Sequence, residues 1–152
     1  MPTPQLHQLT LEFPPSVNNL YVTGKDGRRY LAPRARAYKK TAGWQAKEQG
    51  AREPIAGEVG VILDIYPPAD GRKHDGDNLQ KIVLDSLRGI ALEDDALVYR
   101  LEWEKFKPTT KPRIEVSIYA RAFAAVAVCR PRNLEEGTAA AIVDMLATIK
   151  GE

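Results

Sequence analysis

Hydrophobic and polar residues alternate along four stretches of the chain, which is typical of strands with one buried face. The apolar positions of these stretches are Leu9, Leu11 and Phe13; Val59, Val61, Leu63 and Ile65; Leu97, Tyr99, Leu101 and Trp103; and Ile114, Val116 and Ile118. Only a short turn at residues 107–112 separates the last two stretches, so we expect them to pair as antiparallel neighbours. Two shorter β-prone runs, at residues 20–23 and 28–32, flank a Gly-Lys-Asp-Gly turn and predict a hairpin.

Helical spacing of apolar residues predicts three helices. Residues 33–52 favour a helix with Tyr38, Ala42, Gln45 and Ala46 on one face. The clearest helix follows the second strand, where the apolar positions are Leu79, Ile82, Val83 and Leu87. We expect Asp77 to act as its N-cap and Gly89 to end it. Residues 134–150 predict a further helix near the end of the chain.

These elements predict the α+β class: a single domain in which two main helices pack on a small mixed β-sheet, with an extra C-terminal helix. We place the domain at residues 1–120 and a helical C-terminal extension at residues 121–152. At 152 residues, 43% of them hydrophobic, the chain is long enough to bury one core.

Composition restricts the compartment and the chemistry. Cys129 is the sole cysteine, so an intramolecular disulfide is excluded. The N-terminus lacks the layout of a signal peptide, and the longest apolar run is too short to span a bilayer. We therefore expect a cytoplasmic protein without a membrane partner. Residues 25–52 carry nine basic and two acidic residues, which favours a surface that binds a polyanion, although a solvated basic helix is the commoner source of such a run.

Acidic residues gather at the ends of the predicted elements. Asp75 lies in the loop before the second helix, Asp77 lies in its first turn, and Asp95 precedes the third strand. Three converging carboxylates would repel one another unless a cation lies among them, and Mg²⁺ prefers such oxygen ligands. The competing interpretation is that Asp77 is only a cap, Asp75 a turn residue and residues 93–95 a polar loop.

Lys81 lies one turn after Asp77, on the same helical face. Carboxylates, a lysine and a basic neighbouring surface fit metal-assisted phosphodiester hydrolysis, in which the lysine would neutralise the scissile phosphate. Alternatively, Lys81 pairs with Asp77 or Asp85 along the helix. Arg72 and Lys73 are candidates for phosphate contacts and are better placed for this than His74.

The residues from Asp75 to Phe106 and the run PPSVNNLY at residues 14–21 resemble the RusA-type Holliday junction resolvases. The Asp-x-Asp-Asn-Leu-x-Lys core of that family matches residues 75–81, and its later Asp-Asp pair matches Asp94 and Asp95. The resemblance implies a homodimeric, Mg²⁺-dependent nuclease that nicks four-way DNA junctions symmetrically. By position, it makes Asp75, Asp77 and Asp95 the metal-binding catalytic carboxylates and Lys81 the catalytic lysine.

Branched DNA is thus the expected partner, and the candidate DNA-binding residues are Arg28, Arg29, Arg34, Arg36, Lys39, Lys40, Arg72 and Lys73. Some relatives have arginine directly before the first aspartate, where this chain has His74. The segment beyond Ala120 lies outside the resemblance. Two other functions remain open: a related nuclease that acts on forks or flaps, and a module that binds branched DNA without cutting it.

Overall fold

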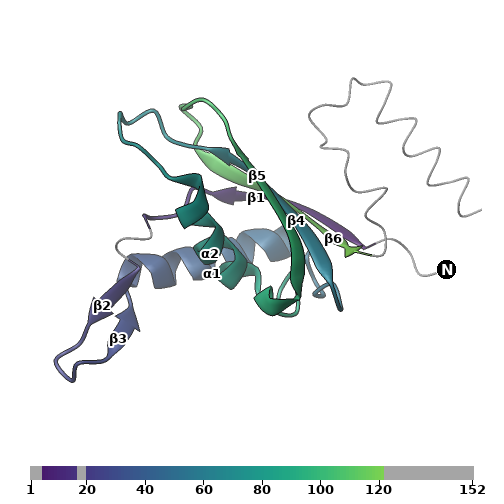
Figure 1. Ribbon diagram of the computed structural model, residues 1–152, viewed down its shortest axis with the longest axis horizontal. Coiled ribbons are helices and arrows are strands. Elements are labelled where there is room, and N and C mark those ends of the chain that lie inside the picture. The colour runs from purple at the N-terminus through teal and green to yellow at the C-terminus, as the bar shows by residue number, and fades with distance from the viewer. Residues whose placement is uncertain (1–4, 17–19, 122–152) are drawn as a thin grey trace, which may run out of the picture.

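The computed structural model describes residues 5–16 and 20–121 of the chain. Within these residues, a mixed four-stranded sheet has the order β1-β6-β4-β5, and a separate two-stranded hairpin extends from the body (Figure 1). The elements in chain order are β1 (Leu6–Glu12), β2 (Tyr21–Thr23), β3 (Arg29–Leu31), α1 (Pro33–Glu48), β4 (Val59–Tyr66), α2 (Gly76–Leu87), the 3₁₀ helix η2 (Asp95–Leu97), β5 (Val98–Lys105) and β6 (Arg113–Ala120). The expected α+β domain, with two helices on a mixed sheet, is confirmed.

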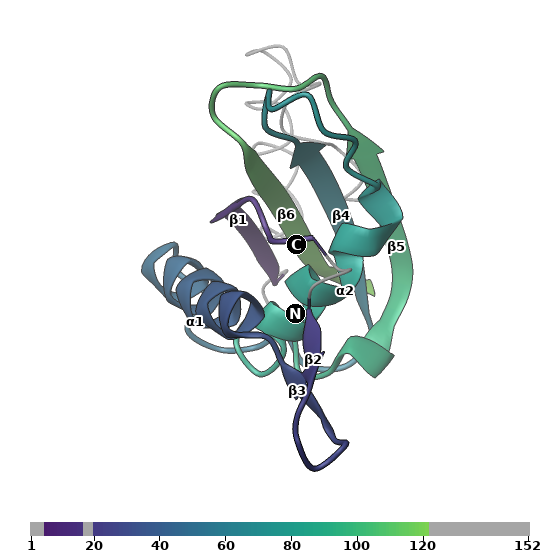
Figure 2. The same cartoon turned by 90° about the vertical axis from the view of Figure 1, so that its left-hand side faces the viewer.

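Both helices cover the same face of the sheet (Figures 1 and 2). On this face of β4, the apolar side chains of Val59, Val61, Leu63 and Ile65 are fully buried beneath them. Helix α2 contributes Leu79, Ile82, Val83 and Leu87 to the same core, as its spacing predicts. The core therefore fixes α2 against the sheet along the whole length of the helix.

The pairing expected for β5 is wrong. It pairs parallel to β4, whereas β6 lies between β1 and β4 and is antiparallel to both. The reason is that α2 carries the chain back along the sheet between β4 and β5, and such a crossover connects parallel strands. Strands β5 and β6 differ in how far their side chains are buried. Ile114, Val116 and Ile118 of β6 are buried, whereas Tyr99 and Trp103 of β5 are 57% and 42% exposed. Strand β5 is thus an edge of the sheet.

The opposite edge of the sheet, β1, is closed by side chains from α1. Gln49 accepts a hydrogen bond from the backbone N–H of Thr10 at 2.7 Å and donates one to its C=O at 2.8 Å. Gln45 accepts from the N–H of Glu12 at 3.0 Å, and the buried Tyr38 hydroxyl donates to the Glu12 C=O at 3.1 Å. These bonds occupy outward-facing backbone groups that an adjacent strand would otherwise use.

The helix ends differ slightly from expectation. Helix α1 ends at Glu48 rather than near residue 52, and Gly50 then adopts a positive φ of 102°. Asp75, not Asp77, occupies the N-cap of α2, because the helix begins at Gly76. The predicted stop at Gly89 is confirmed by its positive φ of 75°. The helix expected at residues 134–150 lies outside the described residues, among which no helix is long and apolar enough to cross a membrane.

Candidate active site

The N-terminus of α2 presents Asp75 and Asp77 to solvent, and Lys81 lies exposed one turn further along. Gly76, between the two acids, is buried against the ring of Trp103 on β5, and a Cβ at this position would lie 2.3 Å from the ring carbon Cζ3. The close contact explains why glycine stands there. This contact with Trp103 therefore places both carboxylates at the end of β5. The sequence pattern did not reveal the contact between Gly76 and Trp103.

The loop before α2 is held by its own polar contacts. Asp70 accepts hydrogen bonds from the N–H of Arg72 at 2.9 Å and, at 3.2 Å, from Nε2 of His74. The bond from the Arg72 N–H is the main reason that the pKa of Asp70 lies below its usual value. The His74 ring also meets the Phe13 ring edge-on at 5.1 Å between centroids. His74 is thus a structural residue of this loop.

An open hollow of about 340 Å³ lies beside Asp75, between this loop and the end of β5. Arg72, Lys73 and Lys105 bring positive charge to its lining. Lys105 extends from β5 and donates a hydrogen bond to the backbone C=O of His74 at 3.1 Å. Arg72 and Lys73, the candidates for phosphate contacts, therefore lie beside Asp75. Lys105 is a third cation at this hollow, and the sequence analysis did not select it.

Residues 93–95 lie at the other end of α2. Asp94 caps η2 by accepting from the N–H of Ala96 at 2.9 Å, and it pairs with Arg88 at 3.0 Å. The Ala96 N–H is the main cause that lowers the pKa of Asp94. Glu93 accepts from the N–H of Gly57 at 3.1 Å. Two of these three acids therefore hold the loop in place, and Asp95 is exposed beside them.

A single copy of the chain does not unite the three predicted metal ligands. Asp75 and Asp77 lie where β4 and β5 end, whereas Asp95 lies where the parallel β5 begins, so the length of α2 separates them (Figure 2). Across residues 5–16 and 20–121, no group of three or more His, Cys, Asp or Glu side chains is arranged to hold a metal ion. The shared ion stays a prediction, and one chain alone does not fit it.

Lys81 is not used in an ion pair along its own helix: in the part of the chain that the structure describes, it pairs with neither Asp77 nor Asp85. The alternative interpretation of Lys81 as a helix-surface ion-pair partner therefore has no contact to support it. Its exposed ammonium group shares the solvent-facing side of α2 with the first two acids.

The basic residues selected from the sequence lie on the hairpin and along α1. The projecting β2–β3 hairpin carries Arg28 and Arg29, both exposed (Figure 1). Arg29 lies over the Tyr21 ring at 5.2 Å. Arg34, Arg36 and Lys40 are exposed on α1, and Lys39 is half-buried. Three aromatic side chains of these elements are also exposed to solvent: Tyr21 and Tyr30 on the hairpin, and Trp44 on α1, the last of them 62% exposed.

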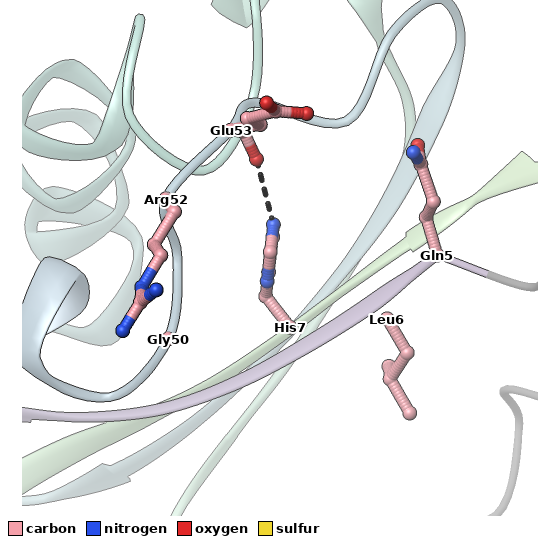
Figure 3. A pocket seen from close by; sticks show the side chains of 6 residues that line it. All are labelled: Gln5, Leu6, His7, Gly50, Arg52 and Glu53. Atoms are coloured by element: carbon pink, nitrogen blue, oxygen red, sulfur yellow. Dashed lines mark hydrogen bonds between the residues drawn. The ribbon is translucent and has the colours of Figure 1, made fainter.

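A second hollow, of about 400 Å³, lies near the start of β1 and is lined by Gln5, Leu6, His7, Gly50, Arg52 and Glu53 (Figure 3). Here Nε2 of His7 lies 3.1 Å from the backbone oxygen of Glu53. The start of β1 pairs with the end of β6, which is the end of the sheet away from the N-terminus of α2. This hollow contains none of the predicted site residues.

The chain is similar to known proteins over the region that contains the predicted site. The family model described as endodeoxyribonuclease RusA matches residues 12–119, which include every acid of the predicted site. Proteins named crossover junction endodeoxyribonuclease RusA from Escherichia coli (strain K12), Shigella sonnei (strain Ss046) and Enterobacteria phage 82 are each 32% identical over 114 residues. Each alignment covers 74% of this chain and 92% of the relative.

Proposed function

Because the chain belongs to the RusA family of endodeoxyribonucleases, we propose that it resolves Holliday junctions by paired symmetric nicks in a Mg²⁺-dependent reaction. The observation that carries this proposal is the family match over residues 12–119, at 32% identity to junction endonucleases over nearly their whole length. The exposed acids and basic hollow at the N-terminus of α2 agree with it.

Phosphodiester hydrolysis needs a water nucleophile, neutralisation of the phosphate and a fixed strand. Asp75 and Asp77 supply carboxylate oxygens at the end of α2, the ligand type that Mg²⁺ prefers, and a bound ion would provide Lewis-acid chemistry at the phosphate. Lys81 would neutralise the scissile phosphate from the same helical face. Asp95 completes the proposed set of metal ligands, although within one chain it lies at the other end of α2 from Asp75 and Asp77.

The basic residues would hold the DNA backbone. Arg72 and Lys73 line the hollow beside Asp75, and they would fix the phosphates next to the cut. The hairpin and α1 extend the positive surface, through Arg28, Arg29, Arg34, Arg36, Lys39 and Lys40. Two symmetric cuts in a four-way junction require two related sites, so we include a homodimer in the proposal. A chromosomal or phage DNA substrate also agrees with the expected cytoplasmic location.

The test is a cleavage assay on a four-way junction, a fork, a flap and a plain duplex, with and without Mg²⁺. We expect Mg²⁺-dependent cutting of the junction in preference to the other three. Asp77→Asn should abolish cutting and leave junction binding equal or slightly tighter, since a charge that repels phosphate is removed. Asp85→Asn, two turns further along the same helix, is the matched control and should cut normally.

Two results would redirect the proposal. Faster cutting of forks or flaps than of junctions would assign the protein to the related nuclease class. Tight junction binding with no cutting by the wild type in Mg²⁺ would instead indicate a module that binds branched DNA without cleaving it.

A further inference from the structure

The four-stranded sheet has a second face, opposite the one that α1 and α2 cover (Figure 1). Because side chains alternate along a strand, this second face carries the even-numbered residues 60–66 of β4 and the odd-numbered residues 113–119 of β6. Strand β5 adds Arg100, Glu102 and Glu104, which lie beside residues 60, 62 and 64 of β4. Central strands of the sheet therefore present side chains on the side away from both helices.

Three side chains at the centre of the second face are nevertheless buried. Ile62 is 4% exposed, Asp64 is 7% exposed and Tyr119 is 2% exposed. Ile62 and Tyr119 do not belong to the core cluster beneath the helices. The Tyr119 ring lies across Gly60, where an added Cβ would be 2.2 Å from the ring carbon Cζ. An apolar sheet face is stable when another layer packs on it, so this centre has the character of a surface that a further segment covers.

A row of three carboxylates crosses the same face. In the register of the sheet, Asp64 lies between Glu115 of β6 and Glu104 of β5. Arg113 pairs with Glu115 at 2.9 Å. Burial of a carboxylate such as Asp64 is costly unless a cation or a hydrogen-bond donor approaches it. This acidic row therefore favours a cover that carries positive charge, and it disfavours DNA, whose phosphates it would repel.

Residues 122–152 have the length and the apolar pattern that this face requires. They follow directly after β6, a central strand of the sheet. The helix predicted at residues 134–150 would be about 25 Å long, and the eight residues of β6 extend over about 26 Å. Neighbouring strands are about 4.8 Å apart, so one helix about 10 Å wide spans the two central strands. The apolar side of the predicted helix consists of Ala141, Ile142, Met145, Leu146 and Ile149.

The same segment carries the charge that the acidic row favours. Arg130 and Arg132 precede the predicted helix. The way back from the end of β6 to Glu115 is about 17 Å, whereas the nine residues from Arg121 to Arg130 extend up to about 30 Å. Both arginines can therefore reach the row, where a planar guanidinium suits a carboxylate.

We propose that residues 122–152 dock on the second face of the sheet of the same chain. The apolar side of the predicted helix packs on Ile62 and Tyr119, and Arg130 and Arg132 lie at the acidic row. The sheet is thus covered on both faces, by α1 and α2 on one and by this segment on the other. This surface and its occupant are independent of the proposed function, because they involve none of the proposed catalytic or DNA-binding residues.

The sole cysteine of the chain allows a direct test. A nitroxide spin label on Cys129 of the full-length protein weakens the backbone amide NMR signals of residues close to it. We expect residues 62–66, 102–104 and 115–119 to lose most of their signal intensity. The signals of Arg36, Lys40 and Trp44, on the solvent side of α1, should keep theirs.

A second label position guards against displacement of the segment by the label itself. Asn133→Cys in a Cys129→Ser background places the nitroxide four residues further along the segment. The proposal is overturned if neither label weakens the signals of the second face, or if either label weakens those of α1.

A mixed sample separates docking within one chain from docking on another copy. Nitrogen-15-labelled Cys129→Ser chains are unfolded in urea and refolded together with spin-labelled wild-type chains that lack nitrogen-15. Only the Cys129→Ser chains are then observed, and docking within one chain leaves their signals at full intensity. Loss of signal at the second face would assign the segment to a partner copy and overturn docking within the chain.

Charge reversal tests the arginines. Arg130→Glu together with Arg132→Glu should release this part of the segment from the acidic row, because like charges then face each other. With the label on Cys129, the signals of residues 115–119 should recover most of their intensity. Adding Glu104→Arg, at an exposed position of the row, should weaken them again.

The matched control changes the charge by the same amount elsewhere. Lys47→Glu together with Arg52→Glu alters the C-terminal end of α1 and the loop that follows it, and it should leave the pattern of weakened signals unchanged. An arginine pair variant that behaves like this control would overturn the placement of Arg130 and Arg132 at the acidic row.

Discussion

Gly76→Ala probes how the acids are positioned, because Gly76 lies between Asp75 and Asp77. The added Cβ would lie 2.3 Å from the Trp103 ring, so the ring or the helix must move by about 1.2 Å to reach an ordinary contact of about 3.5 Å. Overpacking of this kind costs roughly 1–3 kcal/mol, whereas alanine in a helix gains up to about 1 kcal/mol over glycine. The net expectation is a loss of about 1 kcal/mol in the free energy of unfolding.

Activity should fall further than stability. A shift of about 1 Å in the acids can reduce turnover by roughly 100-fold, so we expect the junction-cutting rate to fall by 10- to 100-fold. The assay is a double-mutant cycle with Trp103→Ala, in which urea unfolding is followed by circular dichroism at one protein concentration. Without the ring, Gly76→Ala should stabilise the protein by about 0.5 kcal/mol. If Gly76→Ala changes the free energy of unfolding in the same direction with and without the Trp103 ring, the role of Trp103 would be refuted.

Two further outcomes follow from the fold and the basic surface. Tyr38→Phe removes a buried hydroxyl that donates to the Glu12 C=O, so it should cost about 1 kcal/mol in urea unfolding at neutral pH. Burial raises the pKa of Tyr38 above its usual value near 10.0, so the folded state holds this proton more tightly than the unfolded state. The wild-type advantage should therefore be complete below about pH 10 and shrink as the pH rises further; a constant difference would contradict this. Replacing Arg28 and Arg29 together with alanine should weaken junction binding and reduce the slope of log K against log salt by about 2, measured by fluorescence anisotropy, whereas Arg52→Ala in the distant hollow should change neither.

The sequence predicts the elements well because each follows from local chemistry. Leu79, Ile82 and Val83 repeat with the period of a helix, and Gly89 supplies the left-handed residue that ends it. The Gly-Lys-Asp-Gly turn likewise predicts the β2–β3 hairpin. Such signals span a few residues and need no knowledge of the rest of the fold.

The order of the strands and the separation of the acids are harder to predict from the sequence. Periodicity shows which residues share a face of a strand, but not which strand lies beside it. The charged residues of β5, such as Arg100 and Glu102, are a signal of an edge strand that the pattern analysis did not use. The strand–helix–strand order around α2 also favours a parallel pair. That pair places Asp75, which follows a strand, and Asp95, which precedes one, at opposite ends of the sheet.

Gln45 and Gln49 have a consequence for how far the protein can assemble. A sheet with two unpaired edge strands can add further copies of the chain at both edges and grow into fibrils. Here the glutamine side chains block the β1 edge. Pairing between the β5 edges of two copies would therefore leave no edge for a third copy. Alanine at both positions would expose the blocked backbone and allow the protein to polymerise, which light scattering would detect.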